Sequence, residues 1–205
     1  MSLRAPPPPN PWAPVRAVVS AALAAGAEVP AVRAEPVLYT LDPTHSAVHF
    51  EVRHFDTSTL RGRFALLQGE VTLDRAARSG RVQLVLDTAR VSTGVPPLDA
   101  RLREPDLFDS AAQPQAYFVA ERLEVDAAGS VTGARGELTL RGTSAPLALK
   151  ALRFRCYTSP LFRREVCGGD FEAELPRSRY GMSFGLPLIA DTVKLLVSVE
   201  AIRQE

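Results

Sequence analysis

Three histidines and a serine lie close together near the start of the apolar part of the chain and are the first candidates for chemistry. His45, His49 and His54 fall within one stretch, and Ser46 follows His45 directly. Alternation of polar and apolar residues predicts a strand there. His45 and His49 would lie about 13 Å apart at about 3.3 Å per residue, too far to share one metal ion. His45 and Ser46 would point to opposite faces, so we expect neither a metal site nor a catalytic residue.

His54 differs from the other histidines in its parity. It shares even positions with Val48, Phe50 and Val52, whereas His49 falls on the opposite, solvent-facing set. Residues of one parity lie on one face of a strand. The pattern therefore predicts that His54 is an inward or rim residue that forms hydrogen bonds.

The two cysteines, Cys156 and Cys167, are eleven positions apart, without a CxxC spacing and with no histidine nearby in the sequence. A zinc site is therefore poorly supported, and the alternatives are two unrelated buried thiols or a disulfide. Two segments with the pattern of paired strands flank the cysteines, Leu152–Arg155 and Phe171–Leu175. This arrangement favours a disulfide that closes a hairpin, worth roughly 2–3 kcal/mol, and such a bond persists in an oxidising compartment.

The whole-chain properties restrict the class of protein. The chain has 205 residues, of which 46% are hydrophobic, and its formal net charge is +1. This balance gives no reason to expect a nucleic-acid partner. Residues 1–34 combine basic residues, the apolar run Ala17–Ala25 and an Ala-Val-Arg-Ala site, which predicts a secretory signal peptide. The alternative is a disordered N-terminal segment of a cytosolic protein. Residues 35–205 would form the folded domain.

From Tyr39 onward, alternating segments follow one another with almost no helix signal. About eight strands with short loops fit a closed antiparallel barrel or a sandwich. Within Arg61–Asp74 the apolar parity switches around Gln68-Gly69, as a β-bulge requires, and this favours the barrel. Asp99–Asp109 lacks alternation and predicts one or two helical turns that cap an end of the sheet.

Motifs spread from Val37 to Ile202 resemble the YceI-like family, bacterial periplasmic proteins that bind polyisoprenoids. They are Tyr39, Asp42 and the run from His45 to His54; Gly62, Phe64 and Gly69; Thr93, Asp99, Leu102, Asp106-Leu107-Phe108-Asp109, Pro114 and Phe118; Gly136, Leu138, Leu140 and Gly142-Thr143; and residues 177–182 with Asp191 and Val193. Two positions depart from the family pattern, because Leu98 and Arg101 stand where an arginine and a histidine are common. The pair that usually orients the helical segment is therefore absent or rebuilt, and the cysteine pair marks a variant subset.

The resemblance implies an all-β fold, an extended lipocalin-like antiparallel β-barrel of about eight strands with one short helical segment near residues 99–109. It also implies an apolar channel that holds one isoprenoid chain, either a quinone tail or a polyprenyl phosphate. The implied lining residues are Val48, Phe50, Val52, Phe64, Leu66, Leu138, Leu140, Leu147, Leu149, Tyr180, Met182, Leu195 and Val197. Periodicity alone favours a filled core instead, since eight strands leave little interior space.

Four polar residues are candidates for the rim of the channel: His45, His54, Asp99 and Arg177. Asp99 and Arg177 could orient a head group, but structural ion pairing is the favoured role for both. The resemblance implies a non-catalytic periplasmic carrier or reservoir without a cofactor, with an isoprenoid lipid as partner and transient membrane contact, and it is compatible with a homodimer. An interaction barrel with a filled core and an enzyme acting on a small apolar molecule are the alternatives.

Overall fold

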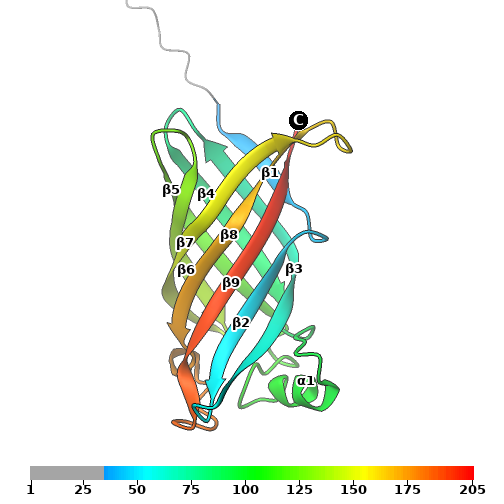
Figure 1. Ribbon diagram of the computed structural model, residues 1–205, viewed down its shortest axis with the longest axis vertical. Helices are drawn as coiled ribbons and strands as arrows, with labels where there is room; N and C mark the ends of the chain where they lie inside the picture. Colours follow the sequence, from blue (N-terminus) through cyan, green and yellow to red (C-terminus); the bar gives the residue numbers. More distant parts are fainter. Residues whose placement is uncertain (1–34) are drawn as a thin grey trace, which may run out of the picture. The chain divides into compact units, whose positions relative to one another are not determined.

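The computed structural model describes residues 35–205, which form nine strands, one α-helix and one 3-10 helix (Figure 1). The elements are β1 (Val37–Leu41), β2 (Ala47–His54), β3 (Ser58–Asp74), β4 (Ser79–Asp87), α1 (Pro96–Leu102), β5 (Gln115–Val125), β6 (Val131–Leu140), β7 (Thr143–Thr158), β8 (Glu165–Pro176), η1 (Arg177–Tyr180) and β9 (Ile189–Arg203). The predicted signal peptide or disordered segment, residues 1–34, lies outside the described residues. Within the described part, no helix is long and apolar enough to cross a membrane.

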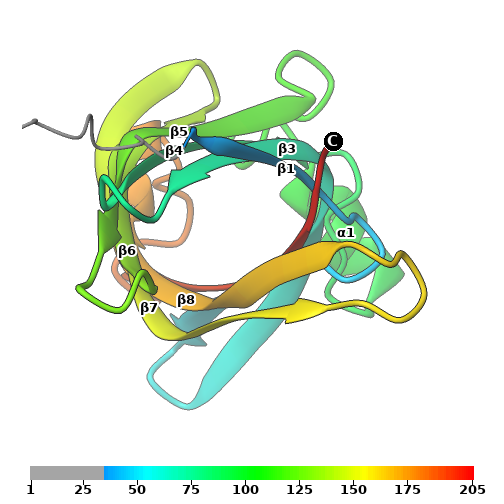
Figure 2. The same cartoon turned by 90° about the horizontal axis from the view of Figure 1, so that it is seen from above.

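The strands close into an antiparallel barrel, as Figure 2 shows in a view along its interior. Their order is β1-β3-β2-β9-β8-β7-β6-β5-β4, and β3 also pairs with β4. Both β1 and β2 lie between β3 and β9, so together they occupy one strand position of the barrel, which is interrupted at residues 42–46. The barrel therefore has eight strand positions, which confirms the predicted fold class.

The barrel follows from alternation along each strand. In β5, Ala116, Phe118 and Ala120 are buried, whereas Tyr117 and Val119 between them are exposed. The predicted bulge in β3 is present, because the pairing of β3 with β4 shifts register between Leu66 and Gln68. Such a bulge raises the local twist of a strand and lets it curve around the barrel.

At the lower end of the barrel in Figure 1 lie α1, the turn between β2 and β3 and the segment from η1 to β9. The helix spans Pro96–Leu102 rather than the predicted 99–109. Two prolines occupy its first turn, where a missing N–H is tolerated. After Leu102 the chain turns back, with Phe108 N–H donating to the Leu102 carbonyl at 2.9 Å, and Asp109 has a φ of +49°.

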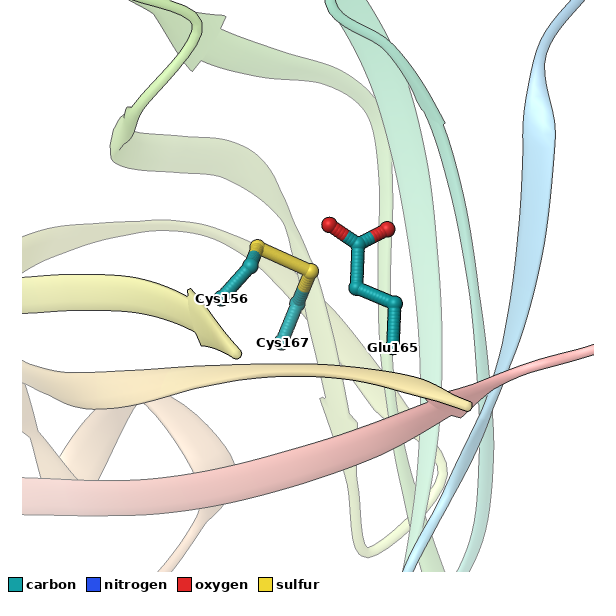
Figure 3. Close-up of side chains that lie close together, drawn as sticks. All are labelled: Cys156, Glu165 and Cys167. Carbon is teal, nitrogen blue, oxygen red and sulfur yellow. A yellow bond between two sulfur atoms is a disulfide. The ribbon is translucent and has the colours of Figure 1, made fainter. Parts of the chain in front are cut away.

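The upper end carries the C-terminus and the predicted disulfide, which joins Cys156 in β7 to Cys167 directly opposite in β8. Glu165 lies beside it (Figure 3). The Glu165 carboxylate accepts hydrogen bonds from the Tyr39 hydroxyl at 2.8 Å and from Arg75 Nη2 at 2.9 Å. Burial, and then the hydrogen bond to Glu165, raises the pKa of Tyr39 to about 12.

Candidate functional site: an apolar cavity in the barrel

A cavity of about 580 Å³ occupies the lower part of the barrel. Strands β2 to β6, β8 and β9 contribute lining residues, and so do the segments around α1 and η1. His54, Ser58, Thr59 and Phe184 line it and are also exposed, so the cavity opens to the surface at the lower end. We call this opening the mouth. Apolar side chains dominate the lining, a composition typical of sites for apolar ligands.

Eight of the thirteen residues that we predicted as lining face this cavity. They are Val48, Phe50, Val52, Phe64, Leu138, Leu140, Met182 and Leu195. Leu149 and Val197 line a second cavity of about 70 Å³ farther up the barrel. Leu66, Leu147 and Tyr180 line neither cavity and are buried in the packed core. The interior is therefore divided into two cavities, and Leu66 and Leu147 are packed into the core without lining either of them.

The predicted lining set omits residues of the helical segment and of the segment before β9. Leu98, Leu102, Leu107 and Phe108 reach the cavity from the helical segment, and Phe184 reaches it from the segment before β9. Further lining residues are Ser58, Thr59, Leu60, Leu86, Thr88, Arg101, Ala116, Leu175, Ile189 and Val193. The four-residue spacing of Leu98 and Leu102 is a helical signal that could have identified their common face.

Phe108 extends the aromatic lining from the helical segment onto the barrel wall. Its ring centroid lies 5.0 Å from that of Phe64 and 6.3 Å from that of Phe50, both in edge-on arrangements. Aromatic pairs favour this geometry at these distances. The segment after α1 is therefore packed onto the barrel by side chains that also line the cavity.

Both departures from the family pattern lie at the cavity. Leu98 and Arg101 are lining residues. The Arg101 guanidinium binds the Asp106 carboxylate through two hydrogen bonds of 2.6 Å and stacks on the Phe184 ring, 4.3 Å from its centroid. These bonds hold the pKa of Asp106 below its usual value. Arg101 thus joins the helical segment to the segment before β9, so an ion pair at this end is rebuilt within the loop.

Arg177 is buried, with 6% of its surface exposed, and it also lines the cavity. Its guanidinium donates to three backbone carbonyls: Ala190 at 2.9 Å, Met182 at 2.7 Å and Ile189 at 2.9 Å. Among residues 35–205 it forms no salt bridge, so the predicted ion pair is not present. Burial lowers its pKa. The carbonyl dipoles offset the cost of burying this charge, and Arg177 fixes the segment that carries Met182 and Ile189.

The other rim candidates have separate positions. Asp99 accepts hydrogen bonds of 2.6 Å from the hydroxyl and the N–H of Thr93, which lower its pKa, and it does not contact the cavity. His45 is not at the rim, because it lies in the connection between β1 and β2 with its Nδ1 atom 2.8 Å from Asp42. His54 is at the mouth, with its ring centroid 4.7 Å from that of Phe55.

The chemistry available at the cavity is limited. The ionisable lining residues are His54, Arg101 and Arg177, and within the described chain no carboxylate lines the cavity. His54 and Ser58 pair across β2 and β3, but no hydrogen bond joins their side chains. At the upper end, Glu165 lies within 4.8 Å of Cys156 and Cys167 (Figure 3). Both sulfurs belong to the disulfide, so neither is a thiolate ligand for a metal.

Fold and cavity together define a closed antiparallel β-barrel with an apolar interior site. The YceI-like domain model matches residues 39–201, and the chain belongs to the YceI-like family. A UPF0312 protein of Pseudomonas aeruginosa is 32% identical over 161 residues, which cover 78% of this chain and 83% of the relative. Protein YceI of Escherichia coli O157:H7 is 27% identical over 162 residues, with the same shares covered.

Two solved structures share the fold. BcnA of Burkholderia cenocepacia has a TM-score of 0.60 and 20% identity, and the match covers 78% of this chain and 98% of BcnA. A polyisoprenoid binding domain from Saccharophagus degradans, implicated in plant cell wall breakdown, has a TM-score of 0.55 and 22% identity. That match covers 81% of this chain and 98% of the domain.

Proposed function

We propose that the chain binds one isoprenoid lipid, with the tail in the lower cavity and the head group at the mouth, and that it acts as a periplasmic carrier or reservoir. The observation that carries this proposal is the apolar cavity of about 580 Å³, which opens at one end of the barrel. Membership of the YceI-like family and the likeness to a polyisoprenoid binding domain support the choice of ligand.

The energetics suit a carrier. Burial of one isoprene unit from water is worth about 4 kcal/mol gross, at roughly 0.8 kcal/mol per carbon. A membrane already shields the tail from water, so transfer from bilayer to barrel is close to neutral in free energy. Exchange with a membrane is therefore reversible, whereas release into water is strongly unfavourable.

The mouth favours a head group with hydrogen-bond acceptors. Arg101, Arg177 and His54 are the ionisable lining residues, and all of them are hydrogen-bond donors when protonated. Arg177 is engaged by carbonyls and Arg101 by carboxylates, which weakens the positive field at this end. The donors available to a head group are His54 and the guanidinium N–H groups outside these hydrogen bonds. A quinone carbonyl or a phosphate oxygen fits these donors.

Exposed apolar residues beside the mouth support transient membrane contact. Phe55 and Leu188 are 50% and 57% exposed, and the Phe55 N–H donates to the Leu188 carbonyl at 2.8 Å. Phe184, which is 49% exposed, belongs to the same lower end. We call Phe55, Phe184 and Leu188 the apolar rim. The disulfide and the predicted signal peptide support a periplasmic location, since disulfides persist in oxidising compartments.

The test is extraction of a prenyl quinone from phosphatidylcholine liposomes by the purified chain, together with mass spectrometry of lipids that copurify from the native host. We expect extraction well above that of an unrelated protein of similar size. Ala116 is buried and lines the cavity, so Ala116→Phe places a ring in the binding space and should reduce extraction at least tenfold. Val119→Phe adds the same ring to the exposed outer face of β5 and should leave extraction unchanged.

An interaction barrel that binds no lipid is the alternative. It is favoured if the wild-type chain extracts no more quinone than the unrelated protein and carries no lipid from its host. Equal extraction by Ala116→Phe and wild type would place lipid binding outside the cavity and would contradict the proposal.

A further inference from the structure

We propose that a packed layer across the barrel limits the tail that the cavity encloses to about four or five isoprene units. This inference rests on the proposed function and adds the length class of the ligand. Three large side chains, Leu66, Phe118 and Leu147, form the layer with Ala120, Ala145 and Ala173. All six are buried, belong to the hydrophobic core and line neither cavity.

The order of residues along the strands places this layer between the two cavities. In β3 and β8 the inward residues run from the lower cavity through the layer to the upper cavity: Phe64, Leu66 and Val71 in β3, and Leu175, Ala173 and Phe171 in β8. In β5, Phe118 pairs with Leu138, which lines the lower cavity, and with Leu84, which lines the upper cavity, so its ring lies at the boundary of the two cavities. The layer is thus the floor of the lower cavity.

The cavity volume sets the length limit. A 150 Å³ apolar cavity holds one benzene, so a buried carbon needs about 25 Å³. On that scale, the 580 Å³ of the lower cavity accommodates about 23 carbons, which is four to five isoprene units. A forty-carbon octaprenyl tail would need about 1,000 Å³. Both cavities together, of about 580 and 70 Å³, do not provide this.

Tails beyond the limit have no enclosed space for their last units. These units must remain in the membrane or face water at the mouth, and each unit moved from the membrane into water is strongly penalised. Extraction from a bilayer should therefore be length-selective. Head-group chemistry alone would give no dependence on tail length, because the head lies at the mouth for every member of a series.

The experiment offers the purified chain phosphatidylcholine liposomes that contain prenyl quinones of four, five, six and eight units at equal amounts. Protein and vesicles are separated, and the quinones bound to protein are counted by mass spectrometry. We expect similar extraction of the four- and five-unit quinones and at least a tenfold lower extraction of the eight-unit quinone.

Two matched variants test the layer itself. Leu66→Ala removes about 75 Å³ of side chain and joins the two cavities, which adds room for about one more isoprene unit. Leu73→Ala removes the same atoms from the same strand but only enlarges the upper cavity, which Leu73 lines. We expect the six-unit quinone to gain at least fivefold relative to the five-unit quinone in Leu66→Ala only. Leu147→Ala opens the same layer from β7 and should act alike if Leu66→Ala fails to fold.

The outcomes separate the two proposals. Equal extraction of all four quinones by the wild-type chain overturns the length limit and leaves the proposed function intact. The same gain for the six-unit quinone in Leu66→Ala and Leu73→Ala overturns the role of the layer. No extraction at any length contradicts the proposed function, and the length limit with it.

Discussion

Gly62 in β3 lies directly opposite Phe50 in β2, and a Cβ atom at Gly62 would overlap the Cζ atom of the Phe50 ring. The absent side chain makes room for a ring that lines the cavity. The methyl group of Thr93 borders the same space, 3.1 Å from the hypothetical Cβ. Glycine at this position therefore sets the orientation of Phe50, and with it the shape of the cavity wall.

Gly62→Ala should destabilise the chain by about 1–3 kcal/mol, because the extra methyl group forces Phe50 away from its packing position. Urea unfolding followed by circular dichroism measures this cost. A double-mutant cycle with Phe50→Leu identifies the cause, since the shorter side chain relieves the overlap. The explanation fails if Gly62→Ala costs as much beside Leu as beside Phe at position 50.

Arg177→Met should cost about 2–4 kcal/mol of unfolding free energy. The substitution keeps an apolar stem but leaves the carbonyls of Met182, Ile189 and Ala190 without their donor. Arg179→Met is the control, because Arg179 is an exposed neighbour in η1. Both variants are compared by urea unfolding at one pH. A cost for Arg177→Met within 0.5 kcal/mol of the control, about the range of ordinary surface substitutions, would exclude a positioning role for its hydrogen bonds.

Loss of the disulfide should lower the unfolding free energy by roughly 2–3 kcal/mol. The bond joins Cys156 and Cys167, eleven positions apart, and so restricts the conformations of the unfolded chain. The measurement is urea unfolding with and without a reducing agent. The Cys156→Ala, Cys167→Ala double variant is insensitive to reductant and serves as the control. The disulfide lies at the opposite end from the mouth, so lipid extraction by the folded double variant should match wild type. A large loss of extraction would mean that the upper end influences lipid binding at the lower end.

The alternation of polar and apolar residues predicted the barrel because it shows which face of each strand is inside. Val52 and Leu66 both follow this rule, and both are buried. Alternation does not show whether inward side chains from opposite strands of the barrel contact one another. Val52 lines the lower cavity, whereas Leu66 lies in the packed layer and lines neither cavity. That difference depends on strand tilt, on the bulge after Leu66 and on the sizes of partners far away in the sequence.

The mouth could not be read from periodicity for a different reason. Arg101 and Phe184 belong to segments without strand alternation, and their contact joins positions 83 residues apart. Hydrogen bonds fix these segments, such as those between Asp99 and Thr93. The prediction of a helix near 99–109 located the right part of the chain, but it did not show that Leu98 and Arg101 face the cavity.

Alkaline pH should weaken the upper end of the barrel through Tyr39. Its pKa is raised from 10 to about 12 in the folded chain, first by burial and then by the hydrogen bond to Glu165. The folded state therefore favours the neutral phenol, and its contribution is complete below pH 10 and is lost as the pH rises toward 12. We expect Tyr39→Phe to lose less stability than wild type between pH 9.5 and pH 12 in urea titrations. Tyr117→Phe removes an exposed tyrosine and should behave as wild type.

The apolar rim should set how fast the chain exchanges lipid with a membrane. Phe55 and Leu188 are exposed beside the mouth but do not line the cavity, so substitution leaves the binding space unchanged. Asparagine suits position 55, where φ is +50°. We expect Phe55→Asn with Leu188→Asn to slow quinone transfer between vesicles at least tenfold, because less apolar surface inserts into the bilayer. The final amount extracted should stay the same.

The matched control for the rim lies at the other end of the barrel. Leu161 and Phe162 are 81% and 40% exposed in the connection between β7 and β8, near the C-terminus in Figure 1. Leu161→Asn with Phe162→Asn removes comparable apolar surface away from the mouth, so transfer should keep its wild-type rate. Equal slowing in both double variants would mean that any exposed apolar surface assists membrane contact. An unchanged rate in the rim variant would mean that lipid enters without insertion of Phe55 and Leu188.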